Sequence, residues 1–191
     1  MQLAAQAEGL SVDDYLAGEE ISEIKHEYVG GVVYAMAGTT REHNLIAGNI
    51  HTAFNNALRG GRCRAFISDF KVRLKALGDD VFYYPDVAVG CDPRDTHRYF
   101  LYFPRVIVEV LSSSTERLDR REKRWSYQSI ETLEEYLLVA QDRVEATLFR
   151  RANRWRPEVF TDLKQIIPLK SLKLRLPLSE VYGGVLGKTP K

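Results

Sequence analysis

A glutamate lies inside an apolar segment of this 191-residue chain. Glu109 interrupts the run Val106–Leu111, and a short apolar run of this kind is typical of a strand buried on both faces of a sheet. Burying an ionised carboxylate there costs several kcal/mol unless a partner compensates its charge. That cost is comparable to the whole free energy of unfolding of a small domain. The alternative is an edge strand on which Glu109 faces water. A buried Glu109 would require a polar site inside the core.

A second carboxylate, Asp86, has a similar setting earlier in the chain. It follows Pro85 in the apolar run Val81–Val89, and the missing N–H of proline predicts an irregularity, an end or a free edge in that strand. If the strands of Asp86 and Glu109 are neighbours, their carboxylates can meet. Two anions in contact need a proton or a cation, and oxygen ligands suit Mg²⁺ or Mn²⁺. The alternative for Asp86 is a turn-forming residue at a strand end.

The composition is that of one ordinary globular domain, with 45% apolar and 28% charged residues. A net charge of +1 predicts no general attraction to nucleic acid. Residues 101–191 nevertheless carry more basic than acidic side chains, which permits a local basic patch. Arginines such as Arg150 and Arg151 either contact phosphates or are solvated.

The two cysteines, Cys63 and Cys91, show no surroundings typical of a zinc site or a disulfide framework. A reducing, cytoplasmic location is therefore expected. No apolar run approaches the ~20 residues of a membrane span, and the N-terminus has no signal-peptide pattern. We expect residues 1–10 to be an N-terminal extension, 11–185 a single domain, and 186–191 a C-terminal tail.

The order of elements predicts a mixed β-sheet flanked by helices, in the α/β or α+β class. Hydrophobic periodicity and turn residues indicate where the elements lie. The expected elements are a helix after Ser11, a hairpin around Gly30-Gly31, a helix over 40–58, strands over 65–74, 81–89 and 106–111, a helix over 115–130, and strands over 135–140, 144–150, 155–160 and 172–178.

The helix expected after Glu109 carries a polar stripe. At 100° per residue, Glu116, Asp119, Lys123 and Tyr127 share one side. Because this helix follows the strand closely, Lys123 could reach the carboxylates, where an ammonium can orient water or stabilise charge on a phosphate. A solvated face is the alternative. His43, near the start of the 40–58 helix, either faces the same site or is a solvated or core histidine.

Taken in chain order, these residues resemble the Uma2 family, whose members are similar in fold to the PD-(D/E)XK restriction endonuclease-like superfamily. The resemblance covers about residues 10–185 and depends on the ordered set, because no single motif is specific. The motifs that carry it are Tyr84-Pro85-Asp86, Val108–Ser112, Ser114-Thr115, Asp119, Lys123, Tyr127 and Leu133–Tyr136.

The resemblance implies a restriction endonuclease-like fold with a metal-dependent phosphodiesterase core. Asp86 matches the first acidic position of the superfamily and Glu109 the second. The superfamily lysine would stand two residues later, where this chain has Leu111, and Lys123 fits a lysine moved to the following helix. Glu27 resembles the additional acidic residue that many members supply from the N-terminal region, although a surface glutamate remains an alternative.

A Mg²⁺- or Mn²⁺-dependent endonuclease acting on DNA is therefore the expected function, with RNA not excluded. The expected catalytic residues are Asp86, Glu109 and Lys123, the metal ligands are Asp86, Glu109 and the Val110 carbonyl, and the accessory residues are Glu27, Asp119, Tyr127 and His43. The alternative is a catalytically inactive module on the same fold that binds nucleic acid or protein.

A homodimer is also expected, since cutting both strands favours two sites about a two-fold axis. The aromatics of segment 99–103 either form its interface or pack in the core.

Overall fold

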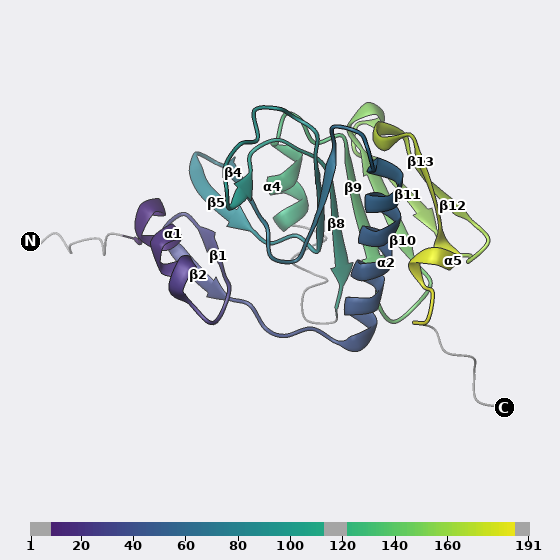
Figure 1. Ribbon diagram of the computed structural model, residues 1–191, viewed down its shortest axis with the longest axis horizontal. Coiled ribbons are helices and arrows are strands. Elements are labelled where there is room, and N and C mark those ends of the chain that lie inside the picture. The colour runs from purple at the N-terminus through teal and green to yellow at the C-terminus, as the bar shows by residue number, and fades with distance from the viewer. Residues whose placement is uncertain (1–8, 113–121, 186–191) are drawn as a thin grey trace, which may run out of the picture.

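The strands of the chain form two larger sheets and a separate hairpin in the computed structural model, which describes residues 9–112 and 122–185 (Figure 1). The first sheet contains, in spatial order, β2 (Val32–Ala35), β1 (His26–Val29), β5 (Asp79–Tyr83), β4 (Lys71–Ala76) and β7 (Phe100–Leu101). The second sheet contains β11 (Pro157–Phe160), β10 (Ala146–Arg150), β9 (Glu135–Ala140), β8 (Pro104–Leu111), β6 (Val87–Gly90) and β3 (Arg64–Ile67). The hairpin pairs β12 (Ile166–Leu169) with β13 (Leu174–Pro177).

Both larger sheets are mixed. Strands β4 and β7 are parallel, as are β8 and β9, whereas the other neighbours run antiparallel. The expected mixed α/β class is confirmed, with the strands divided between two sheets. The helical elements described are α1 (Val12–Ile21), α2 (Arg41–Leu58), α4 (Arg124–Gln128), α5 (Leu178–Val181) and the 3₁₀ turns η2 (Arg151–Asn153) and η3 (Lys170–Leu172).

Side-chain caps start the first two helices where the sequence predicts them. The Ser11 hydroxyl accepts from the N–H of Asp14 at 3.1 Å before α1, and the Thr40 hydroxyl accepts from the N–H of His43 at 3.2 Å before α2. Such caps satisfy N–H groups that have no partner within the helix. The expected helix over 115–130 is represented by α4, since its earlier part lies outside the described residues.

The predicted hairpin is formed by β1 and β2. Gly30 and Gly31 join the strands with φ angles of 55° and 93°. Two successive residues with positive φ are what a type I′ turn requires, and glycine adopts this conformation without a steric penalty.

Two predicted strands are each broken into two. The expected strand over 65–74 becomes β3 and β4, with Ser68 at a φ of 53° between them. The expected strand over 81–89 becomes β5 and β6, with Pro85 in the break. At both breaks the chain passes from one sheet to the other, and the N–H of Ser68 donates to the Asp86 carbonyl at 3.0 Å. The unbroken strand over 65–74 was therefore a wrong prediction, whereas the irregularity expected at Pro85 is confirmed.

The elements pack in layers. Helix α1 covers one face of the first sheet through Tyr15. The other face of that sheet packs on the second sheet, with Tyr127 of α4 in the shared core. Helix α2 packs through Ile46, Ile50 and Phe54 on the far face of the second sheet, and Figure 1 shows it lying in front of these strands. Strand β8 is therefore covered on both sides.

The cysteines correct one expectation. Cys63 and Cys91 form a disulfide, although the sequence suggested none. The residues lie far apart in sequence, and only the pairing of Arg64 with Gly90 across β3 and β6 brings them together.

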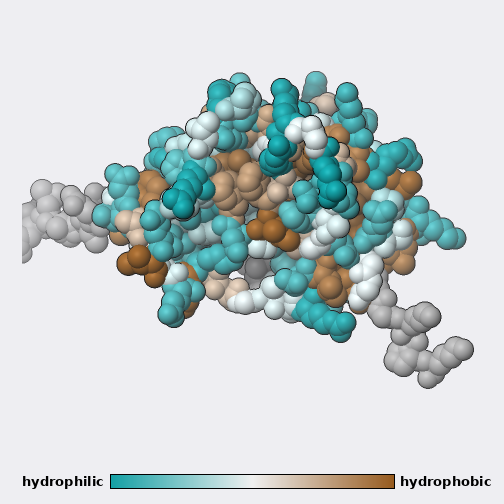
Figure 2. Space-filling model, viewed as in Figure 1, coloured by the Kyte–Doolittle hydropathy of each residue, from teal (hydrophilic) through white to brown (hydrophobic). Residues whose placement is uncertain are grey.

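None of the described helices is long and apolar enough to cross a membrane. Polar residues cover much of the molecular face in Figure 2, with apolar residues gathered in smaller areas.

A buried ion pair joins the strands of the second half. The Arg150 guanidinium donates to Glu135 at 3.0 Å and to the Pro168 carbonyl at 2.7 Å. Glu135 also accepts from the main chain of Lys170 at 3.0 Å and from Ser171. Arg150 is thus a structural residue, so the predicted phosphate contact of Arg150 is wrong.

Strand β12 and helix α5 were not predicted, because their apolar residues form no long periodic pattern.

Candidate functional site

Glu109 lies in the centre of the second sheet. Strand β8 is flanked by β6 and β9, so the edge-strand alternative is wrong. Residues alternate along the strand, and Glu109 shares with Ile107 and Leu111 the face turned toward α4 and the first sheet. Only 5% of its side chain is exposed. The energetic cost of this burial calls for partners.

Asp86 supplies the neighbouring carboxylate from the break before β6. The register Val87–Val108 places Asp86 beside Glu109 on the adjacent strand. The main-chain N–H of Asp86 donates to Glu109 Oε2 at 3.4 Å, and Asp86 Oδ2 accepts from the N–H of Val110 at 2.7 Å. The Asp86 side chain is 19% exposed, so this end of the site opens to solvent.

Lys123 is the cation of the site. It immediately precedes α4, and only 8% of its side chain is exposed. Its ammonium lies 2.7 Å from Glu27 Oε1 and 3.7 Å from Glu109 Oε1. It also lies 5.2 Å from the ring centroid of Tyr83. Lys123 thus lies within ion-pair distance of Glu27 and of Glu109.

Glu27 comes from β1, in the other sheet. Its neighbour Tyr28 packs against α1, so strand alternation turns Glu27 to the opposite face, toward Lys123. Glu27 Oε1 accepts from Lys123 and, at 3.4 Å, from the N–H of Tyr84. The side chain is 10% exposed, which excludes the surface-glutamate alternative.

Tyr127 and His43 each hold one of the central carboxylates. The hydroxyl of Tyr127 donates to Glu109 Oε1 at 3.0 Å. Burial raises the pKa of Tyr127 well above its ordinary value, and the charges of Glu109 and Glu27 raise it further. Tyr127 therefore remains a donor. His43 Nε2 lies 2.7 Å from Asp86 Oδ1, so the start of α2 also contributes.

The charges of this cluster suit a divalent cation. Among the residues that the structure describes, the carboxyl groups of Glu27, Asp86 and Glu109 gather around the ammonium of Lys123. Within the described ranges no three Asp, Glu, His or Cys side chains are arranged to hold a metal by themselves. Mg²⁺ commonly takes one or two carboxylates and completes its shell with water and substrate phosphate. The paired carboxylates of Asp86 and Glu109 fit that mode of binding.

The Val110 carbonyl fits the same role. The N–H and C=O groups of a residue in an antiparallel ladder point to the same neighbouring strand, and the Val110 N–H points to Asp86. The register of β6 and β8 would place residue 85 opposite Val110, but Pro85 has no N–H to donate. An oxygen therefore lies on the carboxylate side of β8 without its usual ladder donor.

Of the residues predicted from the sequence, Asp86, Glu109, Lys123, Glu27, Tyr127 and His43 all belong to this contact network, with Val110 beside it. Asp119 lies outside the described residues. The sequence did not indicate the contacts of Tyr83 and Tyr84 with the network. Their aromatic run before Pro85 reads as ordinary strand packing, and only the three-dimensional arrangement reveals these contacts.

Comparisons with known proteins identify the family of the chain. The family model of Uma2, described as "Putative restriction endonuclease", matches residues 12–179. The uncharacterized protein slr1290 of Synechocystis is 36% identical over 178 residues, which cover 92% of this chain and 93% of that protein. A second Synechocystis protein, the uncharacterized sll1609, is 31% identical over 144 residues, covering 74% and 80% of the two chains.

A solved structure has the same fold. It is the crystal structure described as "a putative nuclease belonging to DUF820" from Anabaena variabilis. Its TM-score is 0.74 at 20% identity, over 93% of this chain and 99% of that chain. The family match covers most of the sequence, and this chain belongs to the Uma2 family.

Proposed function

We propose that the protein is a Mg²⁺-dependent endonuclease, also served by Mn²⁺, that hydrolyses phosphodiester bonds in DNA. The description of its family supports a nuclease. The observation that carries the proposal is the contact of Asp86, Glu109 and Lys123 in one largely buried network. A stabilising role alone does not explain two carboxylates side by side at a sheet crossover.

In this proposal Asp86, Glu109 and the Val110 carbonyl hold the metal ion. When bound, the ion supplies a Lewis acid that activates water and offsets charge on the scissile phosphate. His43 and Tyr127 fix the two carboxylates through contacts of 2.7 and 3.0 Å. The substrate approaches from the side of Asp86, which is the more exposed of the two carboxylates.

Lys123 has the role of the transition-state cation. Its ammonium has three protons to donate, and Glu27 orients it from the neighbouring sheet at 2.7 Å. Its positive charge can stabilise charge that develops on a phosphate oxygen. Glu27 is then a positioning residue, because it acts through Lys123.

The test is a cleavage assay with Mg²⁺ on single-stranded, linear and supercoiled DNA. We expect Asp86→Asn, Glu109→Gln and Lys123→Met each to lower the rate at least about a hundredfold, as loss of a group that stabilises the transition state commonly does. Glu131→Gln, an exposed glutamate outside the network, serves as the matched control and should retain full activity. Cleavage that survives equally in the Asp86 and Glu109 variants would refute the proposal.

A binding module without catalysis is the second candidate. It is favoured by one observation, namely that the oxygens of Asp86 and Glu109 already accept hydrogen bonds from neighbouring groups. Calorimetric titration with Mg²⁺ and Mn²⁺ separates the two candidates. Metal binding that disappears in Glu109→Gln supports the nuclease, and DNA binding without metal binding or cleavage supports the module.

We also propose a two-fold dimer, since two sites would serve two strands. Of the aromatics expected at its interface, Phe100 is buried in the core and Tyr102 is 38% exposed. Light scattering of the purified protein would establish the oligomeric state.

A further inference from the structure

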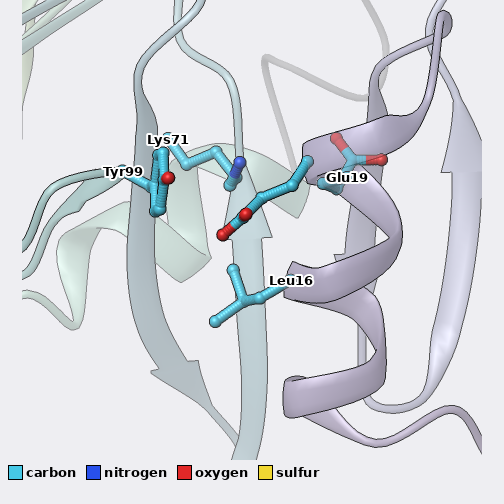
Figure 3. Close-up of a pocket in the computed structure, with 5 residues that line it drawn as sticks. Leu16, Glu19, Lys71 and Tyr99 are labelled. Atoms are coloured by element: carbon cyan, nitrogen blue, oxygen red, sulfur yellow. The ribbon is translucent and has the colours of Figure 1, made fainter.

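A cavity of about 280 Å³ lies between α1 and the outer face of the first sheet. Leu16, Glu19 and Glu20 line it from the helix, and Lys71 and Tyr99 line it from the sheet side. Figure 3 shows Leu16 on the helix pointing toward Lys71 and Tyr99, with Glu19 on the same helix. The volume is just below the ~300–1,000 Å³ of ordinary ligand pockets, so it suits a single heterocycle better than a whole nucleotide.

Lys71 is a buried donor in this cavity. The residue is 7% exposed, and its ammonium donates to the Tyr84 hydroxyl at 3.0 Å. Burial lowers the pKa of Lys71, while the negative charges of Glu19 and Glu20 raise it. An ammonium has three protons, so Lys71 can donate to a further acceptor.

The two glutamates differ in availability. Glu19 Oε1 contacts the His26 ring at 2.8 Å, and Oε2 accepts from the Tyr84 hydroxyl at 2.6 Å. Glu20 is exposed and makes no hydrogen bond or ion pair in the part of the chain that the structure describes. The cavity thus offers an available carboxylate, an ammonium donor, the aromatic ring of Tyr99 and the apolar side chain of Leu16.

This combination selects among ligands. Two carboxylates beside one ammonium disfavour a phosphate or another anion. A flat ring with a polar edge satisfies both the aromatic wall and the charged groups, and unpaired nucleobases are recognised in this way, by stacking and by hydrogen bonds to their edges. Guanine presents two adjacent donors, N1–H and the N2 amino group, next to the O6 acceptor. A carboxylate accepts both donors at once, and lysine is a common partner of O6.

We propose that the cavity binds an unpaired guanine base, with Tyr99 stacked on the ring, Glu20 accepting from N1–H and N2–H, and Lys71 donating to O6. Adenine matches poorly, since its corresponding edge offers an acceptor to the carboxylate and a donor to the ammonium. A paired guanine cannot enter with this edge free. The site therefore favours single-stranded or locally opened DNA that contains guanine.

The cavity is linked to the candidate catalytic site through Tyr84. The hydroxyl of Tyr84 contacts Glu19 and Lys71 in the cavity, and its main-chain N–H donates to Glu27 in the site. The bound base would belong to a nucleotide of the DNA substrate that is held on the outer face of the first sheet. This identification of the ligand as part of the substrate rests on the proposed nuclease function, whereas guanine binding itself does not.

The first experiment is calorimetric titration of the full chain with guanosine and with adenosine, without metal. Guanosine should bind about tenfold or more tightly than adenosine, which is the usual discrimination of a good base contact. Glu20→Gln should weaken guanosine binding about tenfold or more. Glu20 is exposed, so this variant should fold. Glu23→Gln, another exposed glutamate near the end of α1 but outside the cavity, should bind as the unchanged protein does.

The second experiment measures fluorescence anisotropy of labelled single-stranded oligothymidylate that carries one dG or one deoxyinosine. Deoxyinosine lacks the N2 amino group, and its oligonucleotide should bind more weakly by about fivefold or more. Equal affinity for guanosine and adenosine, no binding of guanosine at millimolar concentration, or an unaffected Glu20→Gln variant would each overturn the proposal. Guanosine binding retained in Glu109→Gln, with no cleavage by the unchanged protein, would refute the nuclease alone.

Discussion

Replacing Lys123 by methionine tests whether its ammonium neutralises the buried carboxylates of the site. Methionine keeps most of the side-chain length but removes the charge that lies 2.7 Å from Glu27 and 3.7 Å from Glu109. At an effective dielectric constant of ~20, each of these pairs has a Coulomb attraction of about 4–6 kcal/mol before desolvation is subtracted. All three side chains are at most 10% exposed, so water cannot replace the lost partner.

We expect Lys123→Met to lower the free energy of unfolding by about 3–5 kcal/mol at pH 7, as removal of one partner from a buried pair usually does. For a domain of this size the melting temperature should fall by roughly 6–20 °C. Urea unfolding followed by circular dichroism measures the change. Lys75→Met is the matched control, because Lys75 is 68% exposed and lies 3.5 Å from Asp80. Its loss should be below about 1 kcal/mol.

A double variant sharpens the test. Adding Glu27→Gln to Lys123→Met removes the buried carboxylate that lies 2.7 Å from the lost ammonium, so it should restore about 1–3 kcal/mol. Equal losses in Lys123→Met and Lys75→Met would refute the reasoning that the ammonium neutralises a buried site. A double variant no more stable than Lys123→Met would show that Glu27 and Lys123 are not coupled.

Three further predictions concern stability. Reducing the disulfide between Cys63 and Cys91, 28 residues apart, should lower the unfolding free energy by about 3–4 kcal/mol, and coincident urea curves with and without reductant would contradict this. Glu135→Gln should cost about 1–3 kcal/mol, because the hydrogen bonds from Arg150 and Ser171 lose a charged acceptor while Glu158 still pairs with Arg150; an unchanged urea midpoint would show that the pair is dispensable. Burial raises the pKa of Tyr182 to about 12, so the protonated hydroxyl stabilises the fold below pH ~10 and this contribution is lost as the pH rises through 12. Tyr182→Phe should reduce that alkaline loss, measured by unfolding at several pH values.

Local patterns were sufficient for the elements that frame the site. The apolar run around Glu109 predicted β8, since burial on both faces removes any need for alternation, and the periodic apolar residues of 40–58 predicted α2. The Gly30-Gly31 pair predicted the hairpin that carries Glu27. The positions of the carboxylates within these elements therefore followed from the sequence, together with the family resemblance that singled out Lys123.

Local sequence patterns could not predict the contacts between segments that lie far apart in the chain. Nothing local to Cys63 or Cys91 predicts a disulfide, because their proximity depends on the register of β3 with β6. Arg150 looked like a surface arginine, since its partner Glu135 is brought opposite by strand pairing. The sequence did not predict the cavity beside Lys71 either, because the residues that line it come from α1, β4 and the segment before β7.

The dipeptide Pro85-Asp86 shows how one local irregularity, which the proline predicted, builds the site. An unbroken strand through residue 86 would place a ladder carbonyl against the Val110 N–H, whereas here the Asp86 carboxylate accepts that bond at 2.7 Å. Pro85 in turn cannot donate to the Val110 carbonyl. The crossover therefore places a carboxylate beside Glu109 and leaves a carbonyl oxygen on the same side of β8 without its ladder donor. Three oxygens suited to Mg²⁺ thus arise from the residue types at one sheet crossing, so the position of the break is as important to the proposed chemistry as the buried charge of Glu109.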